Sequence, residues 1–176
     1  MELLNILSKY NGSKRVVKYS QNVGDIITGI LQTNKLYETD YDNICMKFYN
    51  RSLLQTLKNI YYYLENNTHY KIESDSKQTL RSPTAILFLG SNKNIGLDCK
   101  SYSLFIAGIL SALQRRGCKI NWCFRFASYN MGSKLPHHVF VVVNPSTNNE
   151  IWIDPVVKAF DYKKQYFYKI DKKKLN

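Results

Sequence analysis

The sequence predicts an α+β fold in which a central helix packs on an antiparallel β-sheet, with a helical N-terminal extension. Residues 99–113 are apolar on nearly every side, which is typical of a buried helix. Residues 119–126 alternate in hydrophobicity, and residues 137–154 form two β-branched runs around a polar turn, so both stretches favour strands. At 176 residues and 44% hydrophobic, the chain has enough apolar material for one globular domain.

Helices are expected to dominate the first part of the chain. Residues 21–36 form a weak helical stretch. Residues 44–64 repeat apolar side chains at helical spacing, which indicates core packing: Met46, Tyr49, Leu53, Leu57, Ile60 and Leu64. We therefore divide the single domain into a mainly helical part (1–65), a core (66–165) and a basic C-terminal tail (166–176).

Cys99 is expected to open the central helix. Asp98 is a plausible N-cap, and Gly117 is a plausible stop after the last turn. A thiol at a helix start lies at the positive end of the helix dipole, beside unpaired backbone N–H groups. These favour the thiolate and can hold an oxyanion. The sequence therefore predicts Cys99 as a candidate nucleophile.

The two runs at residues 137–143 and 150–154 predict an antiparallel hairpin, because residues 144–149 form turns readily. If the connection is centred near Ser146, His138 and Asp154 lie directly opposite each other. A carboxylate there fixes the imidazole tautomer and leaves the other ring nitrogen free for a thiol. A register slip by one residue would pair other residues, so the hairpin alone does not choose between His137 and His138.

The strand predicted at 119–126 places Ile120, Trp122, Phe124 and Phe126 on one face, which we expect to pack on the central helix. Trp122 is also a candidate for lining a cleft beside Cys99, although burial is the interpretation we favour. His137 is expected to point to the opposite sheet face from His138, and is a second candidate for shaping that cleft.

These residues together resemble the transglutaminase-like superfamily, which has a papain-type cysteine protease fold. A cysteine begins a core helix, His138-Val139-Phe140 matches the histidine motif, and Asp154-Pro155 closes the next strand. The resemblance covers residues 60–165 and implies that His138, not His137, is the catalytic base. Two features depart from the family pattern. Gly96-Leu97-Asp98-Cys99 carries one extra residue, and Lys100 stands where an acidic residue is usual.

A narrower likeness is to small transglutaminase-like proteins of phages and prophages of Bacteroidetes-type bacteria. The stretches that carry it are residues 70–73, 78–83, 98–105, 125–129, 154–156 and Phe160. By this resemblance, Gln78 is a candidate side-chain donor to the oxyanion, because papain-type enzymes place a glutamine amide beside the N–H of the nucleophile. A plain surface glutamine is the alternative.

The resemblance implies a cysteine peptidase or amidase with a Cys99–His138–Asp154 triad and a thioester acyl-enzyme intermediate. The acyl group would pass to water, or to an amine in a crosslinking reaction, and the residues do not select between these acceptors. The expected substrate is a protein or peptide, including phage virion proteins. The alternative is a virion structural or assembly protein that uses the fold without turnover.

Charge and cysteine content argue against several other classes of function. The chain has 25 basic and 13 acidic residues, a net charge of +12, but the lysines are scattered and no nucleic-acid-binding motif is present. We therefore predict no specific nucleic-acid partner. Cys45, Cys118 and Cys123 lack zinc-site spacing and are interpreted as buried free thiols, so we expect no metal and no cofactor.

The N-terminal segment has an apolar patch but no basic leader and no small-residue cleavage site, and no stretch is long enough to span a membrane. We expect cytoplasmic synthesis without a signal peptide and no membrane association. For a phage-encoded protein, the location would be the host cytoplasm or the virion.

Overall fold

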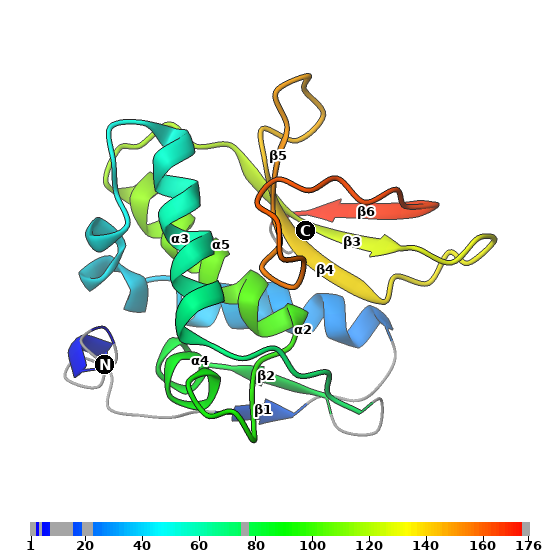
Figure 1. Cartoon of the computed structure of the whole chain (residues 1–176), viewed down its shortest axis with the longest axis horizontal. Coiled ribbons are helices and arrows are strands. Elements are labelled where there is room, and N and C mark those ends of the chain that lie inside the picture. The colour runs from blue at the N-terminus through cyan, green and yellow to red at the C-terminus, as the bar shows by residue number, and fades with distance from the viewer. Residues whose placement is uncertain (1–2, 4, 8–15, 19–22, 75–77, 174–176) are drawn as a thin grey trace.

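The computed structural model describes residues 3, 5–7, 16–18, 23–74 and 78–173. It has N-terminal helices and a central helix, α5 (Cys99–Arg115), packed on a four-stranded antiparallel sheet (Figure 1). The strands, in the sheet order β5–β4–β3–β6, are β5 (Ile151–Ile153), β4 (His138–Val143), β3 (Trp122–Ser128) and β6 (Tyr168–Lys172). The predicted α+β class, with its central helix on an antiparallel sheet, is confirmed.

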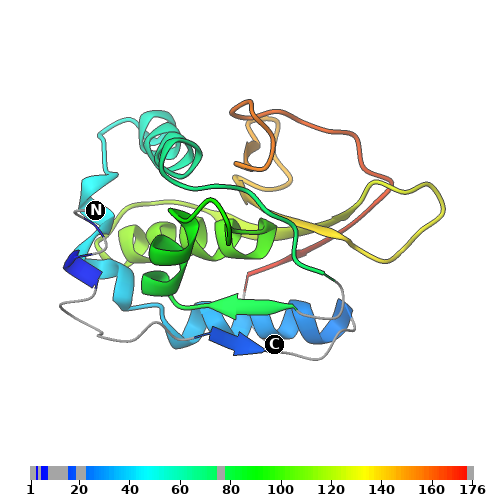
Figure 2. The ribbon, with the colours of Figure 1, turned by 60° about the horizontal axis from the view of Figure 1, so that its bottom comes forward.

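Helix α5 is the centre of the core. The Asp98 side chain caps it by accepting a hydrogen bond from the Ser101 N–H, and the chain turns away at Gly117, where φ is +91°. Both predicted ends of this helix are confirmed. Figure 2 shows α5 between α3 (Leu53–Asn67) on one side and α2 (Val23–Leu36) on the other, which explains why the helix is apolar on nearly every side.

A small second sheet lies beside α2, formed by β1 (Val16–Lys18) and β2 (Thr79–Arg81) in antiparallel pairing. Helix α4 (Pro83–Gly90) follows β2 directly. Its N-cap is Ser82, whose hydroxyl accepts the Ala85 N–H, and Pro83 occupies the first turn. These elements bring the chain from the N-terminal helices to the start of α5.

The predicted helix over 44–64 is wrong in its first nine residues, 44–52. Two short 3₁₀ turns, η1 (Asp40–Asn43) and η2 (Cys45–Lys47), precede α3, and α3 starts only at Leu53. Between η2 and α3, two side chains form hydrogen bonds with the nearby backbone. Asn50 accepts the Ser52 N–H, and the Ser52 side chain caps α3. Such caps compete with a continuous helix. The predicted helix at 21–36 is found as α2 from Val23 onward, and residues 21–22 lie outside the described residues.

The sheet has two different faces. The alternating side chains Trp122, Phe124 and Phe126 of β3 are buried against α5 with Val139, Val141 and Val143 of β4, as predicted for the tryptophan and the two phenylalanines. We call the other side the outer face; it buries Cys123, Ala127, Phe140, Val142 and Trp152. The segment 154–167 crosses this side, and Tyr166 stacks on Trp152 with ring centroids 5.7 Å apart (Figure 1).

The hairpin of β4 and β5 exists, but its register differs from the predicted one. Val141 pairs with Ile153, so the connection is centred at Thr147 and not at Ser146. Asn144 and Ser146 both have positive φ, which lets the turn take up the longer connection. His138 and Asp154 are therefore diagonal neighbours. A shift of two residues leaves each side chain on its predicted face.

The basic C-terminal tail also differs from its prediction. Tyr168–Lys172 forms β6, which pairs with β3 along the edge of the sheet. Asp171 supplies the reason, because its carboxylate receives two hydrogen bonds from Arg125 of β3. The one acidic residue of this basic segment thus holds it in the sheet.

Two of the cysteines interpreted as buried thiols, Cys45 and Cys123, are buried and free, whereas Cys118 is free but partly exposed. Within the described parts of the chain, no helix is both long and apolar enough to cross a membrane.

Candidate functional site

Cys99 is the first residue of α5, and the chain that leads to it is held rigidly. The Leu97 N–H donates to the His69 carbonyl, and the Lys71 N–H donates to the Leu97 carbonyl. Gly96 has φ +66°, and a Cβ atom there would lie 2.8 Å from the His69 oxygen. Only glycine fits this close approach without strain. These contacts fix where the helix begins, and with it the position of the Cys99 sulfur.

The Cys99 thiol lines a cavity of about 610 Å³ and is only partly exposed. The pKa of Cys99 is raised to about 11, mainly by burial and to a smaller extent by the nearby Asp154 carboxylate. Hydrogen bonds from the backbone N–H groups of Val139, Lys100 and Cys99 oppose these effects only in part. This corrects the expectation that the helix start favours a thiolate. In this structure, removal of the sulfur from water outweighs the backbone N–H groups, so the resting group is a thiol.

His138 and Asp154 meet on the same cavity. His138 Nε2 lies 2.6 Å from Asp154 Oδ2, and the second carboxylate oxygen accepts the Val156 N–H at 3.2 Å. With Asp154 ionised, the imidazole carries its proton on Nε2, and Nδ1 is left as the basic nitrogen. Cys99, His138 and Asp154 all line this cavity, so the three residues predicted as a triad are brought together.

Gln78 also lines the cavity. Its Oε1 accepts a hydrogen bond from Lys100 Nζ at 2.6 Å, and its Nε2 donates to the Ser74 carbonyl at 3.0 Å. An amide nitrogen carries two protons, so one N–H is left beyond the bond to Ser74. The structure therefore places Gln78 beside Cys99, with its amide plane fixed from both ends.

Four charged side chains surround the base of this site: Glu73, Arg81, Asp98 and Lys100. Arg81 pairs with Glu73 at 2.6 Å. Lys100 pairs with the carboxylate of Asp98 and lies 3.5 Å from Glu73. We call these four residues the Cys99-side cluster. Lys100 thus points inward and links the helix cap to Gln78.

The two other candidate residues have different positions. His137 precedes the first residue of β4, so strand alternation does not apply to it, and it lines the same cavity as His138. Trp122 does not reach this cavity. It lies at the far end of β3, where it pairs with Val143, and its indole N–H donates to Gln114 at 3.1 Å. The burial of Trp122 that we favoured is confirmed, and its role in the Cys99 cleft is wrong.

The cavity is also lined by Tyr70, Tyr129 and Lys164, which were not predicted from the sequence as site residues. Burial, then the charges of Cys99 and Asp154, raises the pKa of Tyr70 to about 12. Burial, then Asp154 and Cys99, raises the pKa of Tyr129 well above its usual range. Both phenols therefore stay protonated. Strand pairing could have indicated Tyr129 as a site residue, because Tyr129 follows the end of β3 that pairs with His138.

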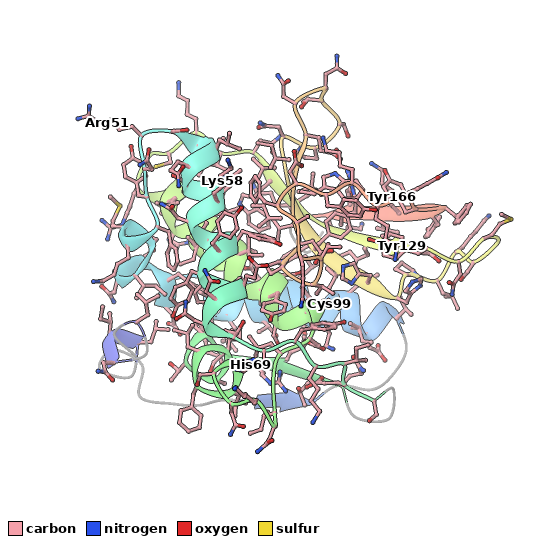
Figure 3. The ribbon with its side chains drawn as sticks, in the orientation of Figure 1. Arg51, Lys58, His69, Cys99, Tyr129 and Tyr166 are labelled. Carbon is pink, nitrogen blue, oxygen red and sulfur yellow. The ribbon has the colours of Figure 1, made fainter. Side chains whose placement is uncertain are left out.

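In the view of Figure 3, Cys99 lies between His69, which precedes the bridge of Tyr70 with Leu97, and Tyr129, which follows β3. Among the described residues, no group of three histidine, cysteine or acidic side chains could hold a metal ion.

Comparison with protein-family models, curated proteins and solved structures gives no match to this chain. The proposals below therefore rest on the residues and the geometry of the site.

Proposed function

We propose that this protein is a thiol enzyme of the transglutaminase-like type, a cysteine peptidase or amidase. The observation that carries the proposal is the 2.6 Å bond between His138 Nε2 and Asp154 in a cavity that also holds the Cys99 thiol. A nucleophile, a base and a group that orients the base are the parts that acyl transfer requires.

The raised pKa of Cys99 defines how the first step runs. Because the resting sulfur is protonated, His138 Nδ1 removes the proton while the sulfur attacks the substrate carbonyl carbon, as a general base does. Asp154 stabilises the imidazolium that forms. The carbonyl π electrons move to oxygen, and the oxyanion accepts hydrogen bonds from the backbone N–H at Cys99 and from the remaining N–H of Gln78.

The intermediate then collapses to a thioester. The C–N bond breaks, the imidazolium gives its proton to the departing amine, and the acyl group stays on Cys99. Water attacks the thioester carbonyl with His138 again accepting the proton, and the carboxylic acid leaves as the sulfur regains its proton. An amine in place of water gives a crosslink, so hydrolysis and transfer share every step up to the thioester.

Acylation of Cys99 by p-nitrophenyl acetate tests this proposal. Release of nitrophenolate and the added mass of one acetyl group on the Cys99 peptide report the reaction. We expect His138→Ala to slow this acylation by about a hundredfold, since general bases contribute factors of that order. Asp154→Asn should slow it as well, and Cys99→Ser should lose the thioester.

Cys118 is an internal control, because it is partly exposed and free but does not line the Cys99 cavity. Acetylation of Cys99 that is no faster than that of Cys118 and is indifferent to His138→Ala would show that the thiol is not activated. That result would favour the second candidate function, a phage structural or assembly protein without turnover. The pKa of about 11 for Cys99 is the observation that favours it.

A further inference from the structure

We propose that Lys164, Tyr129 and His137 form a subsite that binds a carboxylate of the substrate next to the bond that Cys99 attacks. The inference rests on the proposed function and names its substrate class: a peptide with an acidic side chain near the scissile amide. All three residues line the cavity that contains Cys99, His138 and Asp154.

Lys164 supplies the charge. It belongs to the segment 154–167, which begins at Asp154 and crosses the sheet. Its Nζ lies 4.2 Å from the centroid of the Tyr129 ring. Among the described residues, no carboxylate lies within ion-pair distance of it, whereas its neighbour Lys163 lies 3.9 Å from Asp161. An ammonium group held by an aromatic ring, with no acid beside it, remains free to pair with an anion.

Tyr129 fixes this cation relative to the reacting groups. Its ring centroid lies 5.6 Å from that of His137 and 5.8 Å from that of His138. The aromatic ring therefore lies close both to Lys164 and to the imidazole that would act as the base. A ligand that pairs with Lys164 therefore lies in the same cavity as the Cys99 sulfur.

Lys164 differs from the acidic side chains that line the cavity, because each of those already has a basic partner. The acids that line it are Glu73, Asp98 and Asp154, and each already has a basic partner: Arg81, Lys100 and His138 respectively. Burial, then His138 and Lys164, lowers the pKa of His137, so this ring is uncharged at neutral pH and can donate an N–H. The subsite thus offers one full positive charge and a neutral hydrogen-bond donor.

The opposite end of the cavity has a different character. Tyr70 is 42% exposed and Ile72 is 75% exposed, and both line it. In the view of Figure 3, Cys99 lies between His69, which precedes Tyr70 in the chain, and Tyr129. An extended peptide across Cys99 would therefore meet apolar side chains on one side and Lys164 on the other, which fits one acidic residue on a single side of the scissile bond.

Paired affinity labels test the subsite. Bromoacetyl-Gly-Glu amide and bromoacetyl-Gly-Gln amide carry the same electrophile and differ only in the carboxylate. We measure the rate of alkylation of Cys99 by each and take the ratio, which cancels the intrinsic reactivity of the thiol. The wild type should prefer the glutamate label by about fivefold, the scale of one partly exposed ion pair. Added salt should reduce the preference.

Two lysine variants form the matched pair. Lys164→Met keeps the aliphatic stem and should bring the ratio to about one, whereas Lys163→Met, which removes a neighbouring lysine outside the cavity, should leave it unchanged. Bromoacetyl-Gly-Gly with a free carboxylate distinguishes a terminal carboxylate from an acidic side chain as the source. A ratio near one in the wild type, or one that survives Lys164→Met, overturns the subsite.

This outcome is separate from failure of the proposed function. If Cys99 reacts in a manner that depends on His138 but shows no preference for the acidic label, only the subsite is wrong. If Cys99 reacts with neither label, the acetyl analogues of the two peptides are titrated against Cys99→Ser by calorimetry. Equal or absent binding of the two then overturns the subsite, and tighter binding of the glutamate peptide supports it.

Discussion

Two clusters of buried charge lie on different sides of the sheet, and they differ in how completely they are paired. The Cys99-side cluster surrounds the start of α5. The second, which we call the outer-face cluster, consists of Arg125, Glu150, Lys169 and Asp171. In the outer-face cluster, Arg125 is fully buried and donates two hydrogen bonds at 2.8 Å to Asp171 and two more to Glu150.

The arginines of the two clusters differ in the net direction of their pKa shift, because their acidic partners offset burial to different extents. Burial lowers the pKa of Arg125, but the hydrogen bonds and charges of Asp171 and Glu150 more than reverse this, and its pKa is raised. Burial lowers the pKa of Arg81, and Glu73 opposes this only in part, so its pKa stays low. Arg81 Nε is also buried without a hydrogen-bond partner among the described residues.

The two clusters therefore act at different places in the molecule. A fully paired ion group that does not line the cavity serves the stability of the sheet, whereas an incompletely paired one beside Cys99 holds Gln78 and the helix cap in place. The predictions below test this division.

The largest expected effect is on stability, from Arg125→Met. Removing the guanidinium takes away the buried cation that Glu150 and Asp171 share. Glu150 then keeps only the neutral donors Trp152 and Ser146, and Asp171 keeps only the partly exposed Lys169. We therefore expect the free energy of unfolding to fall by about 3–5 kcal/mol. Urea titration followed by circular dichroism measures it. Lys169→Met, at a partly exposed side chain in the same cluster, should cost under about 1 kcal/mol. The folded fraction of Arg125→Met should acylate Cys99 at the wild-type rate, and a slower rate would contradict the division.

Lys100→Met should slow acylation of Cys99 and have a smaller effect on stability, which is the opposite of the result expected for Arg125→Met. The lysine ammonium is already disfavoured, since burial lowers the pKa of Lys100 despite Glu73. Asp98 keeps its hydrogen bonds from Ser101, so we expect the free energy of unfolding to fall by only about 1–3 kcal/mol. Because Gln78 loses the donor that fixes its amide, acylation of Cys99 should slow by about tenfold. Equal acylation rates in Lys100→Met and wild type would show that Gln78 needs no such anchor.

The smallest effect is a dependence of stability on acid. Burial alone raises the pKa of Glu150, but hydrogen bonds from Arg125, Trp152 and the Ser146 N–H bring it from 4.5 to about 2. A depressed carboxyl pKa gives stability that is fully present above 4.5 and is lost as pH falls towards 2. The urea midpoint should therefore decline across this window. Glu150→Gln should start from a lower midpoint and decline less, and an equal decline in both proteins would contradict the assignment.

Local sequence determined where helix α5 begins, and with it the place of Cys99 in the chain's secondary structure. Asp98 and Gly117 marked the ends of α5 because caps and stops act through hydrogen bonds and backbone angles between near neighbours. The alternation of Trp122, Phe124 and Phe126 gave the buried face of β3 for the same reason, since the period of a strand is a local property. The local asparagine and serine caps before α3 were also readable, but the apolar repeat at 44–64 concealed them.

Only the tertiary structure decided which of these elements met and how deeply they were buried. Alternation placed Trp122 on a face but gave no position along the sheet, and its pairing with Val143 puts it at the end of β3 far from His138. The basic C-terminal segment joined the sheet because Asp171 met Arg125 from a distant strand. The same is true of Cys99. Its place at a helix start was local, but the burial that raises its pKa comes from parts of the chain that fold over it.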